Sequence, residues 1–208
     1  MSMNETTSIN ILVENRVETP GLLAEHGLAY LIQRRGRRIM FDTGQGKALL
    51  NNAFRLGVSL PSIETIVLSH GHYDHAGGLA DVLRGDCQKT VYAHPAAIKP
   101  KFASKSDGTS REIGIPYSCQ KALDKSSVRI IATLHPTEIG EGIYVTGPVP
   151  RPTDFEDVGG DFFLDRTCRT PDSIEDDQSI YFDTADGIVV LLGCAHSGII
   201  IRYDTSPN

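Results

Sequence analysis

Short apolar runs alternate with polar loops along the first half of the chain. The apolar runs of strand length cover residues 9–13, 29–32, 39–41, 63–68 and 90–93. Apolar positions within residues 47–56 recur at helical spacing up to Gly57, and residues 78–83 predict a second, short helix that ends near Gly85. Strands that alternate with helices predict a mixed α/β domain, with the strands inside and the helices on the outer faces.

The second half of the chain contains two long stretches without clear periodicity. Residues 98–126 are rich in Lys, Ser and Gly, and residues 148–178 are polar and acidic. Around them, strand-like apolar runs return at residues 128–131, 143–145, 179–182 and 188–192. Long loops inside a compact domain are usually functional, so we expect both stretches to be loop excursions beside an active site.

Length and composition narrow the class of protein. The 208 residues predict a single domain over residues 1–208, and 40% hydrophobic with 22% charged residues is ordinary for a soluble protein. A net charge of −6 argues against nonspecific binding to nucleic acid. The sequence has no apolar run of membrane-spanning length and begins with polar residues rather than a signal peptide. We therefore expect a cytoplasmic protein with neither nucleic acid nor membrane as a partner.

The most informative segment is Ser-His-Gly-His-Tyr-Asp-His-Ala-Gly-Gly at residues 69–78, directly after an apolar run. Imidazole and carboxylate groups together suit divalent ions such as zinc, iron or manganese. In a turn that leaves a strand, His70 and His72 can reach one ion, and Asp74 and His75 then point to a neighbouring ion. The glycines of this segment allow the backbone to fold tightly around such a site.

A second loop has the same design. His196 follows the apolar run 188–192 within Gly-Cys-Ala-His-Ser-Gly, so we predict that it is a further metal ligand rather than a core histidine. Cys194, on the same loop, either supplies a thiolate to the second ion or is an inert thiol beside the site. The other three cysteines lie far apart, and their spacing supports neither a disulfide framework nor a zinc knuckle.

Two further residues follow predicted strands. His94 could contact a metal ion or a substrate, or it could support a ligand from behind. Asp42, in Phe-Asp-Thr-Gly, is expected to accept a hydrogen bond from the N–H of a ligand imidazole and so to fix that ring's tautomer and orientation. Turn formation or helix capping is the alternative role for Asp42, because Asp-Thr-Gly also suits a turn.

The segment at residues 69–78 resembles the metallo-β-lactamase superfamily, whose hallmark is H-x-H-x-D-H after a buried strand. The other segments that resemble it are Glu25-His26-Gly27, Phe41-Asp42-Thr43-Gly44, Tyr92-Ala93-His94-Pro95, Ile113-Gly114-Ile115-Pro116 and Gly193-Cys194-Ala195-His196-Ser197-Gly198. Together they are similar to the branch of metal-dependent hydrolases related to 7,8-dihydropterin-6-methyl-4-(β-D-ribofuranosyl)aminobenzene 5′-phosphate synthase. The resemblance runs from about residue 9 to about residue 200. It implies an αββα four-layer sandwich.

The resemblance also implies a reaction. We expect a metal-dependent hydrolase in which one or two divalent ions, zinc or else iron or manganese, activate a water molecule that attacks a small anionic substrate. Asp74 would orient that water or accept its proton. The basic residues that could hold the substrate anion are Lys99, Lys101, Lys105, Arg111 and Arg151. Arg111 and Arg151 are the better candidates, because they lie in or beside segments that resemble the family. The alternatives are the synthase activity, a transferase reaction, and a metal-binding protein without turnover.

The chain departs from the family pattern near its end. Relatives generally continue past the Gly-Cys-Ala-His-Ser-Gly loop to a final histidine, whereas this sequence has no histidine after His196. We therefore expect an incomplete second half of the sandwich and a second metal ion that is held more weakly than the first. An uncovered sheet edge or apolar face could also favour a homo-oligomer.

Overall fold

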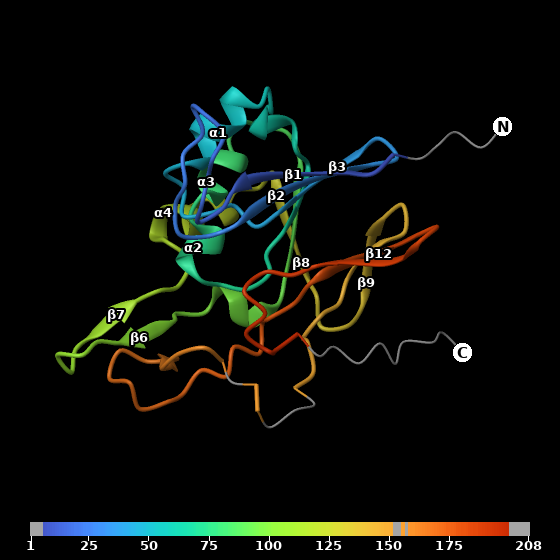
Figure 1. Cartoon of the computed structure of the whole chain (residues 1–208). Helices are drawn as coiled ribbons and strands as arrows, with labels where there is room; N and C mark the ends of the chain where they lie inside the picture. The colour runs from blue at the N-terminus through green and yellow to red at the C-terminus, as the bar shows by residue number, and fades with distance from the viewer. Residues whose placement is uncertain (1–5, 152–154, 157, 200–208) are drawn as a thin grey trace.

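The computed structural model describes residues 6–151, 155–156 and 158–199 (Figure 1). Its larger sheet has six strands in the order β1-β2-β3-β4-β5-β8. These strands are β1 (Ser8–Val13), β2 (Ala29–Arg34), β3 (Arg37–Phe41), β4 (Thr65–Val67), β5 (Lys89–Ala93) and β8 (Val128–Ala132). The first three strands pair antiparallel, and β3, β4, β5 and β8 run parallel. The parallel strands therefore end at one edge of the sheet, where they deliver the residues that follow them.

A second sheet packs against the first. Its four antiparallel strands have the order β13-β12-β10-β9. They are β9 (Thr137–Gly140), β10 (Ile143–Val145), β12 (Ile180–Thr184) and β13 (Gly187–Leu191). Phe41 and Val67 from the larger sheet share a buried cluster with Ile143, Val145 and Phe182 from the smaller one. This cluster is the interior of a two-sheet sandwich.

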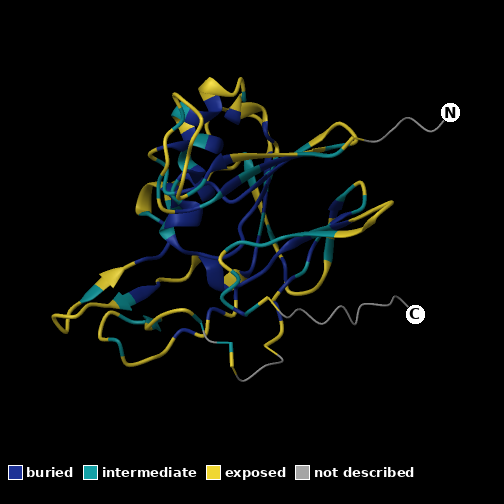
Figure 2. Ribbon diagram, in the orientation of Figure 1, coloured by how far each residue is buried: buried dark blue, intermediate teal, exposed yellow. Residues whose placement is uncertain are grey.

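Helices cover the other face of the larger sheet. They are α1 (Leu49–Arg55), α3 (Leu79–Val82), α4 (Tyr117–Leu123) and the short 3-10 helix η1 (Leu60–Ser62). Within β4, Ile66 belongs to the cluster on the helical side and Val67 to the cluster between the sheets, as the alternation of strand side chains requires. Both faces of this strand are thus buried, which explains its continuous apolar sequence; Figure 2 shows the buried positions concentrated in these layers.

The sandwich has three of the four predicted layers among the described residues. On the outer face of the smaller sheet, the rings of Tyr144 and Tyr181 stack with centroids 5.2 Å apart, and Ile188 is 51% exposed. The labelled helices lie on the side of the larger sheet, and none of them covers this outer face (Figure 1). The prediction of an α/β sandwich with an incomplete second half is confirmed for the described residues. Residues 200–208 lie outside them.

The two predicted loop excursions contain more structure than expected. β6 (Phe102–Ser104) and β7 (Ser110–Glu112) from the first excursion pair with each other, and β11 (Phe162–Phe163) from the second pairs with β6. The 3-10 helix η2 (Pro95–Ile98) leads into the first excursion, which also contains α4. We call the sheet β11-β6-β7 the cover sheet, because it lies beside the loops that carry the histidines. Within the described parts of the chain, no helix is long and apolar enough to cross a membrane.

Candidate metal centre

Two loops and a short helix deliver the predicted ligands to one place. The loop after β4 carries His70 and His72, and the single-turn helix α2 (Tyr73–Ala76) that begins after His72 carries Asp74 and His75. The loop after β13 brings the fifth predicted ligand, His196, from the far end of the sequence. Glycine at the position between the first two histidines is required, because a side chain there would collide with the carbonyl oxygen of Ala97.

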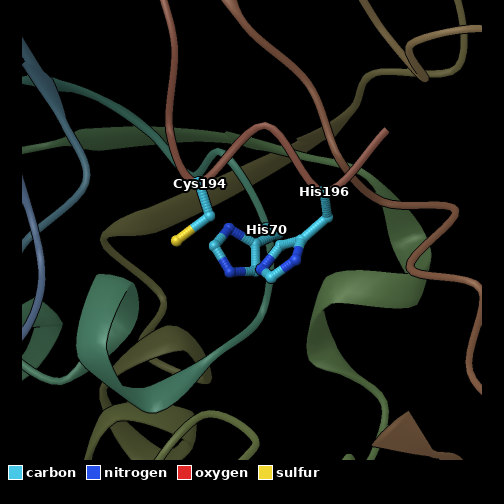
Figure 3. Close-up of side chains that lie close together, drawn as sticks. All are labelled: His70, Cys194 and His196. Atoms are coloured by element: carbon cyan, nitrogen blue, oxygen red, sulfur yellow. The ribbon is translucent and has the colours of Figure 1, made fainter. Parts of the chain in front are cut away.

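His70, His72 and His196 form what we call the three-imidazole group. The ring centroid of His70 lies 4.5 Å from that of His72 and 4.8 Å from that of His196. The centroids of His72 and His196 are 5.1 Å apart. The Nε2 atom of each ring is buried and has no hydrogen-bond partner. Buried polar atoms without partners are rare and costly, so three of them in one place fit a metal-binding site. Figure 3 shows the rings of His70 and His196 next to each other, with Cys194 on the same loop as His196.

Hydrogen bonds at the other ring nitrogen fix the tautomers. The Nδ1 of His70 lies 2.8 Å from the Ser69 hydroxyl, and the Nδ1 of His196 lies 2.6 Å from the carbonyl oxygen of Val158. A carbonyl can only accept, so His196 carries its proton on Nδ1. The hydroxyl of Ser69 already donates to a carboxylate, so it accepts from His70. Both rings are left with a lone pair on Nε2, the atom a metal would take.

Asp42 supports two of the imidazoles from behind. Its Oδ2 lies 2.6 Å from the Nδ1 of His75 and accepts the Ser69 hydroxyl at 2.6 Å, and its Oδ1 accepts the Ser69 backbone N–H at 2.7 Å. Asp42 is fully buried and adopts φ +59°, a backbone conformation that is costly for residues other than glycine. The backbone N–H groups that precede α1 are instead accepted by Glu25. The geometry therefore favours the predicted support of a ligand ring over helix capping.

A second group of donors lies next to the first. One donor atom from each of Asp74, His75 and Cys194 falls within 4.8 Å of the others, and the Cys194 sulfur is 3.0 Å from the Nε2 of His75. We call these residues the mixed group. Cys194 also lies within 4.8 Å of donor atoms of His70 and His196, so its sulfur sits between the two groups. The Nε2 of His26 contacts Asp74 Oδ2 at 3.2 Å.

The surroundings set the protonation of these side chains. Burial lowers the pKa of His70 well below its ordinary value and that of His72 to about 2, so both rings are neutral and can offer lone pairs. Burial alone would also lower the pKa of His75, but the charge of Asp42 raises it. Partial burial of the Cys194 sulfur would raise the pKa of that thiol, whereas hydrogen bonds with His196 and His75 lower it. A lowered thiol pKa favours the thiolate, the form that binds metals.

Two hollows open onto the site and share Asp74 and Cys194 of the mixed group. The first is lined by Tyr73, Asp74, Arg111, Phe162, Cys194 and His196, among others, and the second by Glu14, Asn15, His26, Tyr30, Asp74 and Cys194, among others. In the first hollow, the ring of Phe162 lies 5.0 Å from that of His72, and the guanidinium of Arg111 lies 5.4 Å from the ring of Tyr73. A ligand in this hollow would meet an aromatic face, a cation and the donor groups together.

Three predicted residues have other partners in the structure. The guanidinium of Arg151 donates to the carbonyl oxygens of His196, at 2.9 Å, and of Ser173, so it holds the His196 loop instead of facing a substrate. The Nδ1 of His94 accepts the N–H of Ala96 and caps η2, and His94 joins none of the possible metal groups among the described residues. Lys101 is buried in ion pairs and is not available for a substrate anion. Of the predicted anion contacts, Arg111 alone lines the hollow at the metal centre.

Sequence reasoning missed several residues of the site. Ser69 precedes the histidine segment directly, so its position was a usable signal, and His26 lies in a segment that resembles the family. Phe162 gave no signal, because it lies in an aperiodic polar stretch. It reaches the histidines only through the pairing of β11 with β6.

Comparison with known proteins assigns this arrangement to a family. The family model of the metallo-β-lactamase superfamily matches residues 23–205, which include both donor groups. The chain belongs to this superfamily. Its histidine segment and its three-imidazole group lie within the matched residues.

Two relatives come from Methanocaldococcus jannaschii. The uncharacterized protein MJ0448 is 37% identical over 194 residues, which is 92% of this chain and 71% of that protein. The 7,8-dihydropterin-6-methyl-4-(β-D-ribofuranosyl)-aminobenzene-5′-phosphate synthase is 28% identical over 191 residues, which is 85% of this chain and 63% of the synthase. The chain thus spans somewhat less than two thirds of the synthase.

Solved structures agree with the family. Tm1679, a metal-dependent hydrolase of the β-lactamase superfamily, superposes with a TM-score of 0.73 at 30% identity, covering 91% of this chain and 66% of that one. The metallo-β-lactamase fold protein YhfI from Bacillus subtilis gives a TM-score of 0.53 at 17% identity, covering 90% of this chain and 62% of that one, which speaks for the fold alone. This chain also spans just under two thirds of each of these two structures.

Proposed function

We propose that this protein is a metal-dependent hydrolase that acts on a small anionic substrate. The observation that carries the proposal is the convergence of three imidazoles whose buried Nε2 atoms have no hydrogen-bond partner. The mixed group beside them supplies a carboxylate, an imidazole and a thiol within 4.8 Å of one another. The similarity to Tm1679, a metal-dependent hydrolase, supports the same reaction class.

The donor atoms favour zinc over harder ions. Imidazole nitrogens suit zinc, iron and copper, and a thiolate ligand favours zinc over manganese or magnesium. The three-imidazole group would hold one ion and the mixed group a second. Such ions lower the pKa of water and neutralise negative charge on an attacked carbonyl or phosphoryl oxygen when they are bound. Iron and manganese remain the alternatives that elemental analysis distinguishes.

The protein's own residues would divide the remaining work. Asp74 lies at the junction of the two hollows, where its carboxylate can accept a proton from the attacking water or hold an ion. Arg111 would bind the anionic part of the substrate, because its guanidinium lines the first hollow. Phe162 covers His72 and His196 and would exclude water from that side of the site.

Metal analysis followed by hydrolysis assays in ¹⁸O-labelled water tests the proposal. Purified protein should contain zinc and should hydrolyse some member of a panel of phosphodiesters, thioesters and lactones, with label from the solvent in the product. Replacing His70 by alanine should abolish this turnover. Replacing His135, an exposed histidine outside the site, should leave it unchanged. Protein that binds no transition metal would overturn the proposal.

Group transfer is the second candidate function, because the chain is similar to a synthase over 85% of its length. A hydrolase and a transferase would use the same donor groups and the same anion contact. The labelled-water assay separates them, because a transferase passes the group to an acceptor other than water and leaves solvent oxygen out of the product. Metal binding without either reaction would favour the third reading, a metal-binding protein without turnover.

A further inference from the structure

A buried ion cluster lies next to the metal centre and takes no part in holding the metal. It consists of Lys101, Asp172 and Asp176. The Nζ of Lys101 lies 2.8 Å from Asp172 Oδ2 and 2.8 Å from Asp176 Oδ1, and the side chains of all three are at most 3% exposed. Charges buried this deeply are destabilising unless they are paired and hydrogen-bonded. Because the cluster is buried, it does not serve to keep the surface soluble, and its place beside the metal centre indicates another role.

Asp176 connects the cluster to the ligands. Its second carboxylate oxygen, Oδ2, accepts the backbone N–H of Gly71 at 2.7 Å. Gly71 is the residue between the two histidines, so this hydrogen bond holds the peptide that sets their spacing. The carbonyl of Ala97 packs against the same glycine from another side and leaves no room for a side chain. The ligand loop is thus fixed by a charged group and by close packing.

The residues that follow Asp176 hold neighbouring parts of the site. Asp177 Oδ2 accepts the backbone N–H of Ser197 at 2.6 Å, directly after the ligand His196. The side-chain amide of Gln178 donates to the carbonyl oxygen of Leu68 at 2.7 Å. Three consecutive residues therefore bind backbone groups within two residues of a histidine ligand. Each of these side chains has a defined backbone partner, which charges scattered over a surface do not have.

Lys101 connects the cluster to the cover sheet. It directly precedes β6, and its carbonyl oxygen accepts the backbone N–H of Ile113, next to β7, at 2.8 Å. β7 carries Arg111, and β11, the other strand that pairs with β6, carries Phe162. The buried ammonium group of Lys101 thus links the cover sheet to Asp176. The carboxylate of Asp176 in turn holds the ligand loop.

We infer that Lys101 and Asp176 are positioning residues that set the geometry of the three-imidazole group and fix the cover sheet against it. The inference rests on the proposed metal centre, and it adds residues that neither bind the metal nor touch the substrate. Breaking the link from Asp176 to Gly71 should loosen the spacing of His70 and His72. Metal affinity should then fall even where the fold is intact. Loss of Lys101 should act on both the ligand loop and the cover sheet.

The test compares Asp176→Ala with Asp172→Ala. Both variants remove a carboxylate from Lys101, but only Asp176 also binds Gly71, so Asp172→Ala is the matched control. Cobalt binding by the metal-free protein, followed by its visible spectrum, is the readout. Asp176→Ala should weaken the tight site by about 10- to 100-fold, as loss of a partner behind a ligand does, and should change the cobalt spectrum. Asp172→Ala should have a clearly smaller effect on both.

A second variant keeps the inference testable where the alanine variant fails to fold. Asp176→Asn has nearly the same size, but its amide offers one oxygen and cannot serve Gly71 and Lys101 at once. It should weaken cobalt binding as well, with hydrogen exchange of the Gly71 amide faster than in Asp172→Asn. Equal cobalt affinities for the Asp176 and Asp172 variants would overturn the inference and leave the proposed function standing. Absence of cobalt binding in the unaltered protein would overturn both.

Discussion

The three-imidazole group and the mixed group lie side by side but are built differently. His70 and His72 are buried, and the rings of His70 and His196 have their Nδ1 atoms held by Ser69 and Val158. In the mixed group, His75 alone has a buried partner behind its ring, and Cys194 belongs to the exposed residues of the chain. The donor atoms of the three-imidazole group are therefore held in place before a metal ion binds, and we also call it the prepared group. The mixed group depends on a donor at the surface.

This difference predicts unequal affinities. A ligand whose tautomer and orientation are already fixed loses little freedom when it binds, so a prepared group should bind its ion tightly. The mixed group has to order the thiol of Cys194 and to displace a proton from His75. We therefore expect one tight and one weaker site, in line with the sequence-based expectation. Cys194, for which a thiolate ligand of the second ion was one of two predicted roles, lies close enough to be a third donor for the weaker site.

The largest effect should come from removing two ligands of the prepared group. Replacing His70 and His72 together by alanine should remove most of the bound metal, because one imidazole cannot hold the ion alone. Elemental analysis of purified protein measures this directly, with His135→Ala as the control. Unchanged metal content in the double variant would show that the mixed group, and not the three-imidazole group, is the main site.

Asp42→Asn should weaken metal binding by about 10- to 100-fold. The substitution removes the charge behind His75 and disturbs Ser69, which in turn holds His70. Because Asp42 reaches both groups, both affinities should fall, and the mixed group should lose more. Asp86→Asn, at an exposed position, is the matched control in the same titration. An unchanged metal affinity would show that Asp42 acts only in forming the turn.

Arg111→Gln should raise the KM for an anionic substrate about tenfold or more while changing kcat little. A charge-assisted hydrogen bond contributes about 1.5–3 kcal/mol, and the guanidinium is placed to bind the substrate rather than to react. Arg129→Gln, an exposed arginine on β8, provides the control. Steady-state kinetics with anionic and neutral substrates measure the effect. An equal loss for both substrates would contradict an anion-binding role.

The smallest effect concerns pH. Burial lowers the pKa of His75, but the charge and hydrogen bond of Asp42 together with Cys194 raise it, so protons compete with metal at this ring over a wider pH range. His72, with a pKa of about 2, stays neutral throughout. Burial lowers the pKa of His196, but Cys194, the carbonyl of Val158 and Asp177 together raise it, so the prepared group keeps some pH dependence. As pH falls from 8 to 6, the weaker site should lose affinity more steeply in metal titrations. Parallel losses at both sites would contradict this reading.

The sequence predicted those parts of the molecule that depend on local pattern. The strands and α1 follow from apolar periodicity, and the histidine segment follows from residue type and spacing within a few positions. The cover sheet was not predictable, because β6 and β11 each lie in an aperiodic stretch and pair across more than fifty residues. The partners of Arg151 and Lys101 were missed for the same reason. The sequence does not show whether a long basic side chain binds a substrate, a carbonyl oxygen or a buried carboxylate.

Cobalt titration of the metal-free protein and of Cys194→Ser tests the central claim most directly. The unaltered protein should show a tight phase, followed by a weaker phase with a charge-transfer band from thiolate to cobalt. Cys194→Ser should keep the tight phase and lose the band together with most of the weaker phase. Two equally tight ions in both proteins, or no thiolate band at any cobalt concentration, would contradict the division into a prepared and a weaker site.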